Sequence, residues 1–445
     1  MAGDSAVRLI GALAGTAATI SLATAADLPA EIAPPAPSAA ALFASDWSLT
    51  FASELRYFSW KSDRGYPPSS SGDVQGRGSQ LYVPFAAQLA GKLGNDLKVD
   101  ILGRGGWVRA RQSTSGLSGA IDTITDTVAS ASATYLGFTG FQPFVSVSFN
   151  FPTGESNLSP TQRNARMDPD LVDISSFGEG FNVGPTLGIS VPVAANLVVT
   201  TSVGYTRRGA FLRESSLSPA DPTVTTASRI DPGDVLTGTA SIGYQLGQLT
   251  GRITGSVSGE TDTVIDGQRL FRAGMRYLVS GAWSYAWPAS WGVTTLSASA
   301  SHAKKNKVLF VNAGTLAPVA YDIEPFNSNA NLYRAGIEHL FPMGQLWVGP
   351  TASYLLRDRN GYDSMTLQFV PAKERFSAGL LARFAASERI TFNARVEHVW
   401  TNQHDNSGDV KTSLLLVAPS GIPVTGVPAI ESTGWQIAGG ANVRF

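Results

Sequence analysis

The sequence predicts an all-β fold: a transmembrane antiparallel β-barrel of about 16 strands, with a range of about 12–18. Three observations lead to this prediction. Apolar and polar residues alternate along most of the chain after residue 46, which is typical of strands with one apolar face. Short and long connections alternate along the chain between these strands. The chain ends in the middle of such a strand, on Phe445, rather than in a polar tail.

The composition is unusual for a soluble protein of 445 residues. Charged residues make up 15% of the chain, compared with ~25% in a typical soluble protein. The net charge is −1, so nothing indicates a nucleic-acid partner. The chain has no Cys, which excludes disulfides, thiol nucleophiles and thiolate metal sites. We expect neither a metal nor a cofactor.

The N-terminus indicates export. An apolar stretch of 14 residues follows Arg8, and an Ala-x-Ala sequence that ends at Ala25 provides a cleavage site. A membrane helix needs about 20 residues, so this stretch is too short to be one. The alternative is an N-terminal helix of a soluble domain. The predicted boundaries are 1–26 for the signal peptide, 27–46 for an Ala/Pro-rich linker or arm, and 47–445 for the barrel.

The alternation divides the rest of the chain into sixteen segments. In the fifteenth, an apolar face alternates with a polar face that ends in charged side chains such as Arg395 and Glu397. The fourth segment is the least regular. The predicted strands span residues 47–60, 79–93, 97–110, 122–137, 141–152, 181–193, 197–209, 233–246, 249–262, 269–286, 291–303, 329–341, 346–358, 372–384, 389–402 and 432–445.

The connections support a membrane-spanning barrel. Short connections such as 94–96 and 247–248 alternate with long polar ones such as 153–180 and 304–328. Transmembrane barrels have short periplasmic turns and long extracellular loops. In hydrocarbon every backbone polar group must be paired, so a strand-rich segment can span only as a closed barrel. Aromatic residues near strand ends are typical of interfacial girdles; they are Trp283, Tyr285, Trp287, Trp291, Phe341, Phe384 and Phe445.

With these features the chain resembles Gram-negative outer-membrane β-barrels, and porins in particular. The resemblance implies a bacterial outer-membrane location, contact with membrane lipid and lipopolysaccharide, and passive diffusion of small solutes. It also implies that the barrel-assembly machinery reads Phe445 as an assembly signal. A homotrimer is expected by analogy with porins alone.

Strand parity predicts which charged side chains face the lumen. Inward bases outnumber inward acids, which predicts an anion-preferring pore. The alternative is a solvated wall that ion pairs brace, because a register slip of one residue reverses a strand's parity. The predicted pore-lining bases are Arg56, Lys98, Arg104, Arg252, Arg272, Arg276, Arg334, Arg375, Arg383 and Arg395.

The connection 153–180 is a candidate constriction. In sixteen-stranded porins the corresponding loop folds into the lumen, and by this resemblance six charged residues would set the narrowest point. The alternative is an external loop ordered by turns. This loop lacks the acidic signature of the usual porin loop. The six residues are Arg163, Arg166, Asp168, Asp170, Asp173 and Glu179.

A second resemblance points to other solutes. The sequence FNFPTGESN at 149–157, followed by a Gly-rich hairpin start at 178, is similar to outer-membrane transporters associated with phenol degradation. This resemblance implies transport of aromatic or hydrophobic compounds, with the arm 27–46 as a lumen plug.

Catalysis is not expected. The chain has four His, and none forms a Ser-x-x-x-His or His-Glu-x-x-His pattern. An adhesin or an autotransporter translocator is a third possibility. Strands begin by Trp47, which leaves no room for a passenger domain. The four His are His302, His339, His398 and His404.

Overall fold

The structure is a computed structural model that describes residues 47–63, 76–114, 117–218, 221–288, 291–311, 318–362, 369–405 and 429–445. The predicted signal peptide and linker, residues 1–46, lie outside the described residues. No helix in the described ranges is long and apolar enough to cross a bilayer.

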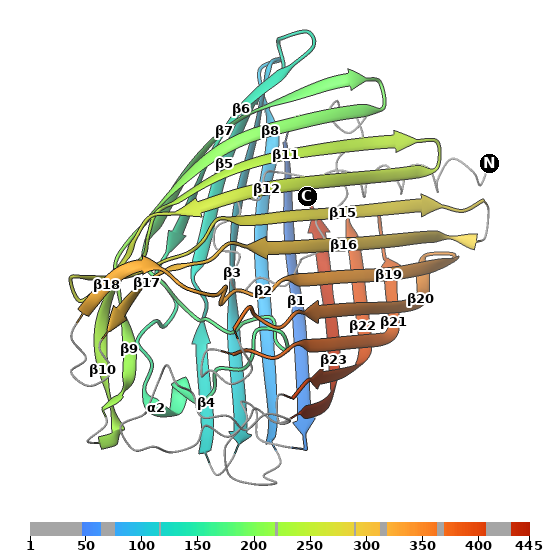
Figure 1. Ribbon diagram of the computed structural model, residues 1–445. Helices are drawn as coiled ribbons and strands as arrows, with labels where there is room; N and C mark the ends of the chain where they lie inside the picture. The colour runs from blue at the N-terminus through green and yellow to red at the C-terminus, as the bar shows by residue number, and fades with distance from the viewer. Residues whose placement is uncertain are drawn as a thin grey trace.

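Sixteen antiparallel strands wind around a common axis and form a closed barrel (Figure 1). The ring closes where β1 pairs with β23, from Thr50 opposite Arg444 to Ser62 opposite Ser432. The predicted fold class and strand number are therefore confirmed. The barrel strands are β1 (Trp47–Ser62), β2 (Gly76–Leu93), β3 (Leu97–Thr114), β5 (Thr127–Tyr135), β6 (Gln142–Phe151), β7 (Asn182–Ala194), β8 (Leu197–Arg208), β11 (Val235–Leu246), β12 (Leu249–Glu260), β15 (Arg276–Ala286), β16 (Val293–Ala303), β19 (Leu332–Met343), β20 (Leu346–Arg357), β21 (Lys373–Ala385), β22 (Ile390–Gln403) and β23 (Ile430–Arg444).

The main sheet has one further strand, β4 (Leu117–Ile124). It pairs only with the outer part of β3, Trp107–Thr114, while β5 pairs with the inner part. The single predicted strand 122–137 is thus two strands with a break at Thr125 and Asp126. At this break the carboxylate of Asp126 accepts hydrogen bonds from two backbone N–H groups of the connection between β6 and β7, those of Gly154 and Glu179.

The outer surface of the barrel is apolar. On β1, Leu49 is 43% exposed, whereas Trp60, which has the opposite parity, is 2% exposed. The same alternation recurs on the other barrel strands, each of which presents large apolar side chains outward. Soluble monomers rarely expose an apolar surface of this extent, whereas a transmembrane barrel requires an apolar band with aromatic girdles. The fold is that of an outer-membrane β-barrel.

Six fully described connections at one end of the barrel are short, and three of them, 195–196, 247–248 and 344–345, have two residues. Two of these three begin with a glycine of positive φ, Gly247 at 59° and Gly344 at 70°. Type I′ and II′ hairpin turns use this backbone conformation, which glycine adopts without a steric cost.

Three long connections at the other end carry hairpins that the sequence analysis did not predict. Together they form a second, six-stranded sheet, which we call the collar, beyond β8, β11, β12, β15, β16 and β19 (Figure 1). The predicted strand 269–286 joined β14 to β15, but the ladder is interrupted at Gly274, whose N–H donates to Asn306 Oδ1 at 2.9 Å. The collar strands are β9 (Phe211–Ser218), β10 (Asp221–Asp231), β13 (Thr263–Ile265), β14 (Gln268–Arg272), β17 (Lys307–Val311) and β18 (Pro318–Ile323).

Candidate functional site

The connection between β6 and β7, residues 152–181, crosses the interior of the barrel; we call it the inward loop. In a ring of sixteen strands, β20 and β21 lie eight strands away from β6 and β7, on the opposite wall. Asp170 of the loop accepts hydrogen bonds from both of these strands, from Arg357 Nη1 at 2.6 Å and from Lys373 Nζ at 3.2 Å. Arg375 Nη1 also donates to the Asp170 carbonyl oxygen, at 2.9 Å.

Four residues fasten the loop to this wall, and we call them the latch: Asp168, Asp170, Arg357 and Lys373. The ammonium of Lys373 lies 2.5 Å from Asp168 Oδ2 and is fully buried. A buried ammonium is very costly unless it is paired and hydrogen-bonded. Two carboxylates satisfy it here, and Arg357 shares the second one. The loop must therefore stay docked if the buried Lys373 ammonium is to keep the two carboxylates that neutralise its charge.

Further contacts join the loop to β1, β2 and β3. Arg56 Nη1 lies 3.4 Å from Asp173 Oδ2. Gln80 exchanges two hydrogen bonds with the Ile174 backbone, at 2.6 Å from its Nε2 to the carbonyl oxygen and at 3.2 Å from the N–H to its Oε1. Gln112 Nε2 donates to two loop carbonyls. The Gln80 and Gln112 side chains make the hydrogen bonds that a neighbouring strand would make in a sheet. The loop backbone is irregular, and its N–H and C=O groups cannot be left unpaired inside the barrel.

An apolar cluster fills the space between the loop and the wall. Its wall members come from β1, β3, β4, β22 and β23, and its loop members are among the most buried side chains in the chain. The cluster lies inside the barrel, where a water-filled channel would have polar side chains. It comprises Phe58, Trp60, Val108, Ala110, Ile121, Leu158, Ala165, Met167, Leu171, Val172, Phe177, Val399 and Ile430.

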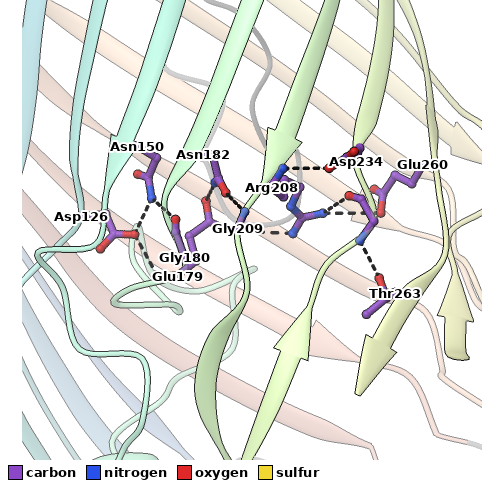
Figure 2. Close-up of polar contacts among 11 residues, drawn as sticks. Asp126, Asn150, Glu179, Gly180, Asn182, Arg208, Gly209, Asp234, Glu260 and Thr263 are labelled. Atoms are coloured by element: carbon purple, nitrogen blue, oxygen red, sulfur yellow. Dashed lines mark hydrogen bonds and ion pairs between the residues drawn. The ribbon is translucent and has the colours of Figure 1, made fainter. Parts of the chain in front are cut away.

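The two ends of the inward loop meet at Asp126, and Figure 2 shows its contacts with Glu179 and Asn150. The carboxylate accepts the N–H of Gly154 at 2.9 Å and the N–H of Glu179 at 2.8 Å. Asn150 Nδ2 donates to the same carboxylate at 2.7 Å. A Cβ on Gly154 would lie 1.9 Å from the Phe177 carbonyl oxygen, so only glycine fits here. This contact gives the Pro-Thr-Gly sequence a structural role at the root of the loop.

The root of the loop is joined to the collar side through Arg208 on β8 (Figure 2). Its guanidinium lies 3.9 Å from Glu179 Oε2 and 3.6 Å from Glu260 Oε2. Within the collar, burial and a hydrogen bond to Asp262 (2.8 Å) raise the pKa of Tyr321 to about 12. The Tyr321 phenol therefore stays a neutral donor to Asp262. Hydrogen bonds and ion pairs of this kind, rather than a continuous ladder between strands, hold the collar at the end of the barrel.

Nine of the ten predicted pore-lining bases lie on barrel strands with inward parity. Arg272 does not. It lies on β14 of the collar, 3.8 Å from Asp262 Oδ1, and its assignment to the lumen is corrected. The predicted strand missed the break at 273–275, so its register was extended past the end of the barrel wall. The nine are Arg56, Lys98, Arg104, Arg252, Arg276, Arg334, Arg375, Arg383 and Arg395.

Most of these nine cations have no carboxylate partner in the part of the chain that the structure describes. Arg56, Lys98 and Arg395 form ion pairs with acids. Among the residues that the structure describes, the other six have no carboxylate oxygen within 4.0 Å. Arg252 donates instead to Ser241 Oγ at 3.2 Å, and Arg375 to Gln436 Oε1 at 2.9 Å. The inner wall therefore carries an excess of positive charge.

The charge is unevenly placed around the barrel. Three unpaired arginines, Arg334, Arg375 and Arg383, lie on β19 and β21. The opposite wall, β5 to β8, presents hydroxyl groups inward, and we call it the hydroxyl wall. A solute inside the barrel would have guanidinium groups on one side and neutral donors and acceptors on the other. The hydroxyl wall comprises Ser130, Ser132, Thr134, Ser146, Ser148, Thr186, Ser190, Thr200 and Ser202.

The six predicted constriction residues have different surroundings. Asp168, Asp170 and Asp173 contact the wall, as described above. Arg166 pairs with Glu214 of β9, and Glu179 lies at the root of the loop. Arg163 ends the short helix α2 (Pro160–Arg163). Sequence reasoning did not pair the loop with its wall cations, because Arg357 and Lys373 are 187 to 205 positions away from their partners.

The described His lie apart from one another. His339 Nδ1 contacts Thr294 Oγ1 at 2.7 Å, and His398 packs between Trp400 and Trp435 on the lipid-facing side. Within the described residues, no group of three or more His, Asp or Glu is placed to hold a metal ion. The backbone N–H of Phe445 donates to the Leu49 carbonyl oxygen at 2.8 Å, while its side chain is 67% exposed.

No protein-family model matches this chain, and no curated protein sequence matches it. Several solved structures are similar to it. A mutant of TodX, described as a monoaromatic hydrocarbon channel, has a TM-score of 0.38 and 11% identity, over 92% of this chain and 93% of its own. An outer-membrane channel from Pseudomonas putida F1 has a TM-score of 0.35 and 8% identity, over 90% and 97%.

A triple-mutant porin from Rhodopseudomonas blastica has a TM-score of 0.30 and 10% identity, over 88% of this chain and 99% of its own.

Proposed function

We propose that the protein is a bacterial outer-membrane channel for the passive diffusion of small solutes, with a preference for anions. The observation that carries this proposal is the excess of unpaired arginines on the inner wall. Charges of one sign in a cleft with low-dielectric walls focus the field and raise the local concentration of counter-ions. Rings of Arg or Lys select anions in other pores by this effect.

The inward loop is the proposed constriction. It crosses from β6 to β20 and β21, so a solute must pass beside it. Its acids are directed at wall cations, so they neutralise Arg357 and Lys373 rather than forming an acidic face. The unpaired Arg252 and Arg383 lie near the short-turn ends of their strands, away from the latch. We propose that the loop limits solute size and that these deeper arginines select charge.

The proposal also covers the orientation of the barrel in the membrane, its export and its assembly. The long connections and the collar face outward, and the short turns face the periplasm. Residues 1–26 direct export and are removed. Phe445, the last residue after the closing strand, is the signal for the barrel-assembly machinery. A homotrimer stays a prediction based on the porin resemblance.

Reversal potentials in planar bilayers test the anion preference. Under a KCl gradient, the wild-type channel is expected to show the sign of an anion-preferring pore. The variant Arg252→Gln/Arg383→Gln is expected to move the potential toward zero, while Arg207→Gln, which removes a cation from the outer face, is not. A cation-preferring wild type, or equal potentials in the two variants, would refute the proposal.

A second candidate function is transport of aromatic or hydrophobic compounds. The apolar cluster inside the barrel favours it, because Phe58, Trp60 and Phe177, which are buried against the docked loop, would offer aromatic surface to a solute when the loop moves away from the wall. Conductance near zero, together with uptake of an aromatic compound into proteoliposomes, would favour this candidate over the ion-conducting channel. Catalysis has no such support, because none of the described His belongs to a hydroxyl–imidazole–carboxylate series.

A further inference from the structure

Three cations lie together on the outer face of the barrel, at the long-connection ends of three consecutive strands. Lys61 of β1 is directly opposite Arg77 of β2. Arg111 of β3 is opposite Ser79, one step diagonally from Arg77. All three side chains are exposed. We call Lys61, Arg77 and Arg111 the cation cluster. Like charges placed directly opposite each other across strands destabilise a sheet, so this arrangement needs a reason.

Acidic side chains lie near the cluster without pairing with it: Asp63, which is exposed two residues after Lys61, accepts the backbone N–H of Glu431 at 3.2 Å. Within the described residues, none of the three cations has a carboxylate oxygen within 4.0 Å. The nearby Asp122 is occupied by Arg109 Nε at 3.8 Å and by Trp107 Nε1 at 2.7 Å. The cluster therefore combines close like charges with free hydrogen-bond donors, which is an arrangement that favours an anion from outside the chain.

The height of the cluster on the barrel indicates where that anion comes from. On β1, the eleven residues from Trp47 to Tyr57 match the length of one membrane crossing, about 9–11 residues. Lys61 lies four residues beyond Tyr57, and Arg111 lies four beyond Trp107. Four residues of a tilted strand rise about 10 Å, which places the cluster above the aromatic girdle, at the level of lipid headgroups.

We propose that the cation cluster binds the phosphate groups of a phosphorylated glycolipid in the outer leaflet. The cluster faces away from the lumen, so its partner approaches from the membrane and is not a solute in transit. Guanidinium groups match phosphate geometry with paired hydrogen bonds, and Arg77 and Arg111 supply two of them. The inference rests on the proposed outer-membrane location, but not on the anion preference of the pore.

Binding of defined lipids to the purified full chain tests this proposal. Native mass spectrometry in detergent would measure the affinity for diphosphoryl lipid A, for its monophosphoryl form and for a dephosphorylated form. We expect the affinity to fall in that order. The variant Lys61→Gln/Arg77→Gln/Arg111→Gln is expected to bind diphosphoryl lipid A on the order of 100-fold more weakly, since each cation near a membrane surface contributes about a 5-fold increase in binding.

The matched control, Arg207→Gln/Arg213→Gln/Arg229→Gln, removes the same charge from other exposed positions on β8, β9 and β10, and these side chains have no ion pair among the described residues. It should bind lipid A as the wild type does. Inorganic phosphate should not displace the lipid; displacement would indicate a site for free phosphate and overturn the proposal. Equal affinity in the two triple variants, or equal affinity for the three lipids, would also overturn it.

Single-channel conductance of the same preparations verifies that each variant is folded. We expect it to be unchanged in both, because the substituted side chains lie outside the lumen. A normal channel that has lost lipid binding supports the proposal independently of the pore's selectivity. A cation-preferring channel that still binds lipid A through the cluster would refute the proposed anion preference alone.

Discussion

The variant Asp170→Asn tests whether the latch holds the tip of the inward loop. Asn has nearly the same size as Asp but carries no charge. In the variant, Arg357 and Lys373 each lose the ion pair with Asp170, while Lys373 keeps the one with Asp168. We expect the tip of the loop, residues 168–176, to leave the wall more often than in the wild type, while the rest of the loop stays in place.

The size of this effect can be worked out from burial. Removing one partner of a buried ion pair costs about 3–5 kcal/mol. The lower end applies here, because Lys373 keeps one carboxylate and Asn keeps a carbonyl acceptor. About 3 kcal/mol corresponds to about a 150-fold change in the ratio of docked to undocked tip. Leu171 is 2% and Val172 4% exposed, and burial of each stabilises the docked loop by about 1.5–3 kcal/mol, so complete release is not expected.

Two measurements report on the mobility of the tip: the mobility of a spin label and single-channel conductance. The chain contains no Cys, so Ser176→Cys gives a unique position for a spin label on an exposed residue of the loop. Asp170→Asn should increase the mobility of this label and add short-lived conductance levels to single-channel records. It also removes one negative charge beside the wall cations, so the reversal potential should move further toward anion preference.

Asp266→Asn serves as the control. Asp266 lies in the β13–β14 turn with a φ of 49°, a conformation that Asn adopts readily, and the substitution removes the same charge outside the lumen. The label and the conductance should match the wild type in this variant. Equal label mobility in the wild type and Asp170→Asn would show that the latch does not hold the tip, and the reasoning would fail.

Two further predictions concern assembly and the root of the loop. Deletion of Phe445 should lower the amount of inserted barrel far more than it changes the conductance of the barrels that insert; an unaltered membrane level would contradict this. Gly154→Ala should lower the temperature at which the barrel unfolds in a gel-shift assay, by an overpacking cost of about 1–3 kcal/mol, because its Cβ would lie 1.9 Å from the Phe177 carbonyl oxygen. Gly103→Ala, whose Cβ meets nothing within 4 Å, is the control, and equal unfolding temperatures would argue against a tight root.

The barrel strands were predictable because lipid and water impose a local pattern on them. The last predicted strand, 432–445, corresponds to β23 (Ile430–Arg444), and the fifteenth, 389–402, to β22 (Ile390–Gln403). In each, every second residue must be apolar, so a window of about ten residues determines both the strand and its parity. Parity then placed residues such as Arg383 on the inner wall.

The collar and the contacts of the loop could not be predicted in the same way. The collar strands β14 and β17 lie beyond the membrane-spanning part of the barrel, so no alternation of apolar and polar residues marks them. Arg272 was assigned to the barrel wall because the predicted strand was extended past the end of that wall. The latch joins Asp170 to residues 187 and 203 positions away. Such a pairing depends on the closure of the ring, which places β6 opposite β20, and no local window contains that information.

The distribution of charge along β20 and β21 separates two properties of the channel. At the long-connection ends, Arg357 and Lys373 are neutralised by loop acids. At the short-turn end of β21, Arg383 has no carboxylate within 4.0 Å among the described residues. Changes in the latch should therefore alter both loop mobility and selectivity, because they free wall cations as they loosen the tip. Changes at Arg383 should alter selectivity alone, since no loop contact depends on it. If Arg383→Gln also mobilised a label at position 176, size and charge selection would share one structural element, and the division of roles between loop and wall would be wrong.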